Sequence, residues 1–169
     1  GTDSQVILIT TSEEMLEKVQ AEVDLQLIKL TRKDIAAKSL ENSKLILVNN
    51  KEEAMDLSNA YAPEHLIIET LDYAELSKNV INAGSVFLGS YTPESAGDYA
   101  SGTNHTLPTH GYAMAYNGVN LDSYNRKVTF QEITPEGIRQ IGNAVEIMAE
   151  NEHLDAHKNA MKLRVDDVK

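Results

Sequence analysis

Four short apolar runs, separated by segments with a helical pattern, most constrain how this chain folds. They span residues 5–10, 44–49, 66–69 and 84–89. Continuous apolar runs of this length are typical of strands buried on both faces. Helical patterns fill the intervals, the clearest from Glu13 to Leu27 behind the N-cap candidate Ser12. Alternation of strand and helix predicts an α/β fold with a parallel sheet and crossover helices.

The pattern changes beyond Thr109, and residues 110–120 are irregular. Residues 127–131 alternate in polarity and predict a short strand. Thr134-Pro135 is a helix start, with threonine as the cap and proline in the first turn, and the apolar stripe continues to about Asn151. A second helix is expected over 154–163. These features predict a small helical C-terminal domain.

The segment from Glu94 to Thr109 has neither a helical nor a strand-like apolar period, so we expect a long loop. Loops of this length are usually functional or disordered, and this one follows a well-defined strand. It carries Asp98 and His105, side chains that bind metals or move protons. A solvated surface loop is the alternative explanation.

Two further groups contain side chains suited to catalysis or metal binding. Glu64 and His65 follow the turn at Pro63 and are suited to general acid and base catalysis. His153 and His157 are one turn apart if their helix is continuous, a spacing that can chelate zinc. The alternatives are a loop glutamate beside a packed histidine, and a solvated helix face.

Composition narrows the classes of function. The 169 residues carry 26 acidic and 15 basic side chains, a net charge of −11, and lack a basic cluster, which argues against nucleic-acid and anionic-membrane partners. We find no membrane-spanning run and no leader, and we expect a cytoplasmic protein. The sequence contains no cysteine, which excludes disulfides and thiolate chemistry.

Several motifs together resemble the histidinol dehydrogenase family. They are Tyr61-Ala-Pro-Glu-His-Leu-Ile67, Ala83-Gly-Ser-Val-Phe-Leu-Gly89, the whole of 93–109, and Leu154-Asp-Ala-His-Lys-Asn-Ala160. The resemblance extends from Gly1 to the C-terminus. It implies oxidation of L-histidinol to L-histidine, the last step of histidine biosynthesis, through an aldehyde and with two NAD.

The resemblance also implies roles for individual residues. Glu64 would activate water and His65 would be the catalytic base. Asp98 and His157 would be zinc ligands. The substrate would be bound by a set that shares some of these residues: His65, Asp98, His105, Glu152 and His157. His153 is not part of the family pattern. In this family the enzyme is a homodimer whose tail domain reaches into the partner's active site.

The family protein is longer than this chain, which resembles its C-terminal part. The fold implied is a partial Rossmann-like parallel sheet with crossover helices, followed by a small helical C-terminal domain. We expect half of a Rossmann-like domain over 1–60, part of a second α/β domain over 61–119, and the tail over 120–169. The remaining zinc ligands and all NAD contacts would lie upstream, so we expect no cofactor-binding residue for NAD here and no activity from this chain by itself.

Two other functions fit parts of the sequence. The first is that of a non-catalytic unit that keeps the fold and binds zinc or a partner. A zinc hydrolase with Glu64 as base would need three ligands, for which His153, His157 and Asp98 are the candidates. An incomplete sheet would also leave open strand edges, so we expect self-association or rearranged packing.

Overall fold

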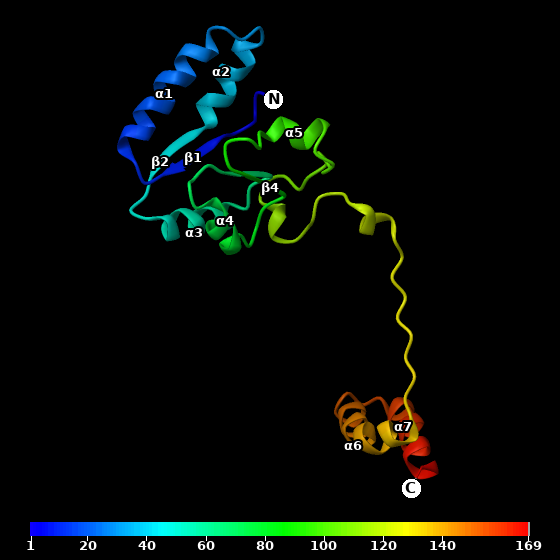
Figure 1. Cartoon of the computed structure of the whole chain (residues 1–169). Coiled ribbons are helices and arrows are strands. Elements are labelled where there is room, and N and C mark those ends of the chain that lie inside the picture. Colours follow the sequence, from blue (N-terminus) through cyan, green and yellow to red (C-terminus); the bar gives the residue numbers. More distant parts are fainter. Residues whose placement is uncertain (169) are drawn as a thin grey trace. The chain divides into compact units, whose positions relative to one another are not determined.

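The computed structural model describes residues 1–168 and divides the chain into two compact units, one ending at Tyr124 and the other beginning at Asn125 (Figure 1). The first unit contains β1 (Ile7–Thr10), α1 (Glu13–Leu27), α2 (Lys33–Asn42), β2 (Lys44–Leu47), α3 (Lys51–Tyr61), β3 (His65–Ile68), α4 (Tyr73–Leu76), η1 (Ser77–Asn79), β4 (Ser85–Leu88), α5 (Glu94–Tyr99), η2 (Tyr112–Met114) and η3 (Leu121–Tyr124). The second contains α6 (Pro135–Asn151) and α7 (Asp155–Asp167).

The strands form two parallel pairs, which confirms the predicted α/β class. β1 pairs with β2 in the register Ile7↔Lys44, and β3 pairs with β4 in the register His65↔Ser85. Helices α1 and α2 connect the first pair, and α4 with η1 connects the second. Each connection is therefore a helical crossover of the kind that parallel strands require.

Local signals in the sequence account for the helix starts. The Ser12 hydroxyl accepts a hydrogen bond from the Met15 amide at the start of α1, and Asn50 accepts one from Glu53 at the start of α3. Helix α3 ends at Ala62, which adopts a left-handed conformation (φ 53°) and is 1% exposed. Pro63 follows, and the chain enters β3 at His65. This turn places Glu64 and His65 at the start of a strand.

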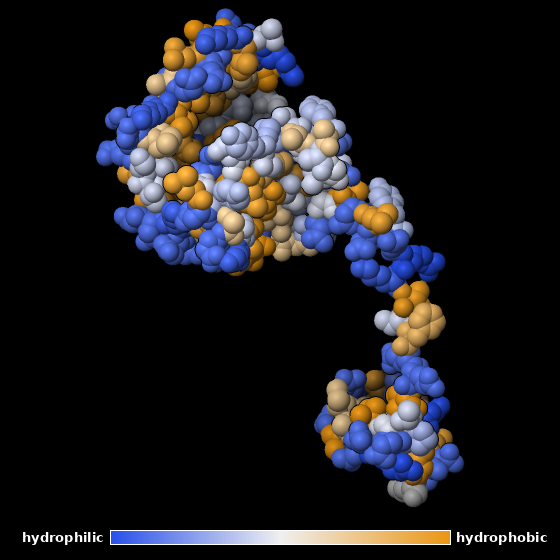
Figure 2. All heavy atoms as spheres, viewed as in Figure 1, coloured by the Kyte–Doolittle hydropathy of each residue, from blue (hydrophilic) through white to orange (hydrophobic). Residues whose placement is uncertain are grey.

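The strands are less buried than their apolar sequences predict, and the expectation of burial on both faces is wrong. In β2, Leu45 is 40% exposed and Leu47 is 49% exposed. The buried apolar side chains of the first unit are few, namely Val48, Met55, Ala62, Ile68 and Phe87. A two-stranded sheet has few covering layers, so apolar side chains remain on the surface, as Figure 2 shows for both units.

The second unit is a pair of packed helices. The Thr134 hydroxyl accepts the Gly137 amide and Pro135 opens α6, as predicted. Ile138 and Ala149 are buried against α7, which continues to Asp167, beyond the predicted end. An ion pair of 2.7 Å joins Lys158 to Glu150 and holds the pKa of the lysine above its usual value.

Two expectations for the C-terminal region and for membranes can be compared directly with the structure. Residues 127–131 form no strand, because no other strand pairs with them, and Val128 and Phe130 are exposed. Over the described residues, no helix has both the length and the apolar character needed to cross a bilayer.

Candidate functional site

Helix α5 brings two carboxylates to one place. The expectation of a loop throughout 94–109 is wrong in its first part, because Glu94–Tyr99 is helical. Periodicity did not reveal this helix, since its one buried residue is Gly97. Glu94 and Asp98 are four residues apart, and this spacing puts both side chains on the same face of the helix.

A close contact with β4 positions this helix. A Cβ built on Gly97 would lie 2.7 Å from Cε1 and 3.0 Å from Cζ of Phe87. Phe87 is 4% exposed and belongs to the core. Only a residue without a side chain allows α5 to approach the sheet this closely. The position of Glu94 and Asp98 therefore depends on Gly97.

A second close contact positions the turn that precedes β3. A Cβ on Gly84 would lie 2.6 Å from the Glu64 carbonyl oxygen. That oxygen accepts the Ser85 amide at 2.9 Å, and the Pro63 carbonyl accepts the Gly84 amide at 2.9 Å. These two hydrogen bonds fix the main chain of the Pro63–Glu64 segment against the start of β4.

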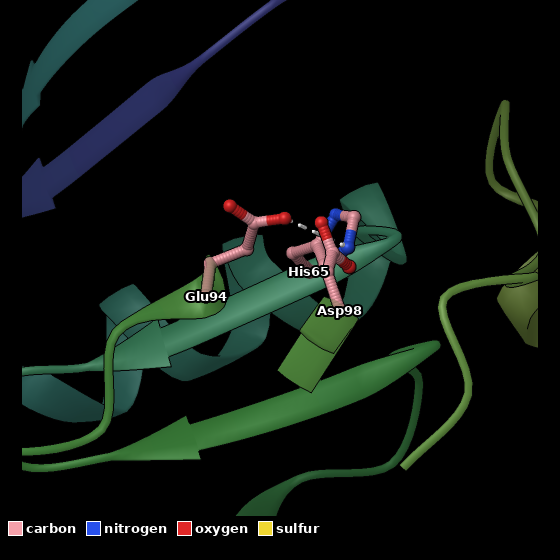
Figure 3. A group of neighbouring side chains, drawn as sticks. All are labelled: His65, Glu94 and Asp98. Atoms are coloured by element: carbon pink, nitrogen blue, oxygen red, sulfur yellow. Dashed lines mark ion pairs between the residues drawn. The ribbon is translucent and has the colours of Figure 1, made fainter. Parts of the chain in front are cut away.

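His65, Glu94 and Asp98 converge in the first unit (Figure 3). One ligand atom from each lies within 4.8 Å of the others. The His65 Nε2 atom is 3.5 Å from Glu94 Oε1. It is buried and has no hydrogen-bond partner. The imidazole also stacks at a tilt on Phe87, with ring centroids 5.9 Å apart. One ring nitrogen thus faces two carboxylates.

The chemistry of this group fits a divalent cation. An imidazole nitrogen and carboxylate oxygens are donors that zinc accepts. A buried nitrogen without a hydrogen-bond partner has an unmet interaction, because buried polar atoms are normally satisfied. Asp98, predicted as a zinc ligand, belongs to this group. The donor set therefore suits a metal held in part by Asp98.

The other predicted residues of the first unit lie nearby in the chain but outside this group. Glu64 is half-buried directly before β3. His105 is exposed in the segment after α5, where the Thr106 amide donates to the Asn104 side chain. The structure thus brings together His65 and Asp98 from the predicted set, and adds Glu94.

The remaining predicted residues belong to the second unit. Glu152 and His157 are exposed, and His157 lines a groove with Ile138 and Met161. The proposed helical pairing of His153 with His157 is wrong. His153 has φ 58° between α6 and α7, where its amide donates to Glu150 and the Leu154 amide donates to Ala149. This left-handed C-terminal cap breaks the helix.

Glu94 is the site residue that sequence reasoning missed. The sequence predicts a loop from Glu94 onward, and in a loop the spacing of Glu94 and Asp98 has no helical meaning. The signal that was available is the i, i+4 spacing of two acidic residues beginning after Pro93, a proline that precedes the first helical turn.

We expect the substitution Gly97→Ala to destabilise the first unit by about 1–3 kcal/mol, the usual cost of overpacking. Helix propensity alone would give a stabilisation of about 0.5–1 kcal/mol, so the two effects have opposite signs. Chemical denaturation measures the difference. Ser95→Ala, at an exposed neighbouring position of α5, is the matched control. The second substitution Phe87→Leu should recover part of the loss caused by Gly97→Ala, and equal stability of Gly97→Ala and wild type would contradict the close contact.

Comparisons with known proteins agree on one family. The family model described as Histidinol dehydrogenase matches residues 1–165. The chain is 67% identical to "Histidinol dehydrogenase" of Bacteroides thetaiotaomicron, over all of this chain and 40% of that protein. It is 50% identical over 98% of its length to the "Histidine biosynthesis trifunctional protein" of Saccharomyces cerevisiae, of which it covers 21%.

A solved structure gives the same result. The crystal structure of histidinol dehydrogenase from Elizabethkingia anophelis matches with a TM-score of 0.89 and 50% identity, over 99% of this chain and 39% of that one. The chain spans about two fifths of the length of the single-function relatives that it matches. With the family model covering nearly all of its residues, the chain belongs to the histidinol dehydrogenase family.

Proposed function

We propose that this chain supplies the C-terminal part of a zinc-dependent histidinol dehydrogenase, which oxidises L-histidinol to L-histidine through an aldehyde with two NAD. The observation that carries the proposal is the convergence of His65 with Asp98 and Glu94, inside the motifs that match the family. The residue types of this group suit the two oxidation steps.

The first oxidation converts the alcohol to the aldehyde. A hydride leaves the carbon that bears the hydroxyl only as the hydroxyl proton is removed, so the reaction needs a positioned base. His65 takes this proton on its imidazole. Its ring is held between Phe87 and the carboxylates of α5, and a base held in this way accelerates such a step by about 10²–10⁴-fold.

The second oxidation requires water. Glu64 takes a proton from a water molecule, whose oxygen forms a bond to the aldehyde carbon and gives the hydrate. Once His65 has released its first proton to solvent, loss of a second hydride from the hydrate to the second NAD, with a proton passed to His65, gives the carboxylic acid. Glu64 is suited to this role by its place directly before His65, with its main chain fixed by the bond from Ser85.

Asp98 and His157 would be ligands of the zinc ion, which would supply a fixed anchor for the imidazole and amine of histidinol. His65, Asp98, His105, Glu152 and His157 would bind the polar groups of the substrate. NAD would be bound by the part of the enzyme outside this chain, as the family resemblance implies.

We also propose that the enzyme is a homodimer in which the tail supplies Glu152 and His157 to the partner's site. Exposed apolar side chains of the second unit, such as Ile147, Met148 and Leu163, support an interface there. Sedimentation equilibrium of the full-length enzyme tests this, and a monomer at micromolar concentration would contradict it.

The chain by itself should produce no NADH from histidinol, even with zinc and NAD present. We expect activity when the chain is joined to the upstream part of the Bacteroides thetaiotaomicron enzyme, to which it is 67% identical. Circular dichroism of both proteins provides the folding control. Histidinol-dependent NADH formation by the chain alone would contradict the proposed need for upstream residues. An inactive but folded full-length fusion would favour a non-catalytic zinc- or partner-binding unit.

A further inference from the structure

We propose that Glu94 is a positioning residue for His65: its carboxylate fixes the imidazole in the orientation from which it removes the substrate's proton. The inference rests on the proposed function. Glu94 is not among the site residues predicted from the sequence.

The contact that Glu94 makes with His65 distinguishes it from the other polar groups around that ring. Its Oε1 atom lies 3.5 Å from His65 Nε2, the one ion-pair contact recorded for that ring among the described residues. This separation is slightly longer than an ordinary hydrogen bond of 2.7–3.2 Å. The Nε2 atom is buried and has no hydrogen-bond partner. A small rotation of either side chain would give it one.

The elements that carry the two side chains are themselves held in place. His65 is the first residue of β3 and pairs with Ser85 of β4. Glu94 is the first residue of α5, whose approach to β4 is limited by the contact of Gly97 with Phe87. The His65 ring lies on the same Phe87. One aromatic side chain is therefore the common support for the histidine and for the helix that carries the glutamate.

The chemistry of the transfer gives the carboxylate its role. When His65 takes the proton, both of its ring nitrogens carry hydrogen, so an N–H at Nε2 faces Glu94 whichever nitrogen accepted it. The Glu94 carboxylate accepts that hydrogen bond. Its side chain is 41% exposed, against 27% for His65.

Asp98 is the alternative partner for the His65 imidazole, and the two carboxylates are expected to have different roles. Asp98 lies one turn further along α5 and is the predicted zinc ligand. With Asp98 committed to the metal, Glu94 remains for the imidazole. Glu94→Gln should therefore lower the rate of the chemical step while leaving the metal content unchanged.

The experiment uses the full-length enzyme that contains this chain, with the variants Glu94→Gln, Glu94→Asp, His65→Gln and the double variant of His65→Gln with Glu94→Gln. We expect Glu94→Gln to lower kcat by about 10–100-fold, a loss of the size that follows removal of the outer carboxylate partner of a metal-bound histidine. KM for histidinol and zinc content should stay within about twofold of wild type, and Glu94→Asp should recover part of kcat. In the His65→Gln background, the Glu94 substitution should have little further effect, because a residue that acts through His65 has nothing left to position.

The control is Glu75→Gln, which removes the same charge from a surface glutamate paired with Lys78. A rise in KM with unchanged kcat would overturn the proposal in favour of substrate binding by Glu94. Loss of zinc would overturn it in favour of a ligand role, and additive losses in the double variant would show that Glu94 acts independently of His65. If His65→Gln itself kept full activity, the proposed function would fail; if only Glu94→Gln kept it, this inference alone would fail.

Discussion

Replacing His65 with glutamine in the full-length enzyme is expected to lower kcat for histidinol oxidation by about 10²–10⁴-fold. Glutamine has a similar length but cannot accept and release a proton at neutral pH, so the variant removes the proposed base and keeps a polar side chain against Phe87. NADH formation measures the loss, and an unchanged unfolding midpoint shows that the fold is intact.

Glu64→Gln provides the comparison that assigns the two roles. If Glu64 acts on water as proposed, its substitution should lower the oxidation of added L-histidinal much more than the oxidation of L-histidinol to the aldehyde. His65→Gln should lower both. Equal losses in the two steps for Glu64→Gln, or a full rate for His65→Gln, would contradict the assignment of base and water activator.

The second large effect is expected for Gly84→Ala. The added Cβ would lie 2.6 Å from the Glu64 carbonyl oxygen and 3.2 Å from Cδ of Pro108. The carbonyl is main chain and is bonded to the Ser85 amide, so it cannot move without breaking that bond. We expect a destabilisation of about 1–3 kcal/mol from overpacking, with about 0.5–1.5 kcal/mol more if the hydrogen bond is lost.

Activity should fall further than stability alone explains, because displacement of Glu64 and His65 by about 1 Å can cost about 10²-fold in rate. Chemical denaturation and kcat of the full-length enzyme are the two measurements. Ser85→Ala keeps the neighbouring amide and is the control. Unlike the clash at Gly97, this one has a main-chain partner, so no second side-chain truncation should rescue it. Wild-type activity in Gly84→Ala would contradict the close approach of the two segments.

The apolar runs predicted the strands because hydrophobic content and bounded length are properties of the local sequence. The start of α6 was equally readable, since Thr134 and Pro135 are direct signals for a cap and a first turn. The burial of the strand side chains could not be predicted from the sequence in the same way. Leu45 and Leu47 have the composition of a core strand, and their exposure depends on what packs on β2, which is not encoded in the strand itself.

The site was predicted in part for a similar reason. His65 and Asp98 stood out as chemical groups in matching motifs, whereas Glu94 becomes relevant only when α5 is known to be helical. That helix has no apolar stripe, because its contact with the sheet is made by Gly97. The spacing of His153 and His157 suits a chelating pair only in a continuous helix, and the left-handed conformation of His153 ends the helix before the pair can form.

The cluster is assembled from one short stretch of polypeptide. Its strands and its helix all lie within residues 65–99. Loop closure becomes harder only slowly with chain length, by about 0.6 kcal/mol per doubling, and contacts between residues close in sequence form quickly. A single contiguous segment of the chain therefore contributes His65, Glu94 and Asp98. A gene fusion that retains residues 65–99 therefore retains every element that carries these three side chains. The chain itself matches about a fifth of a yeast trifunctional protein.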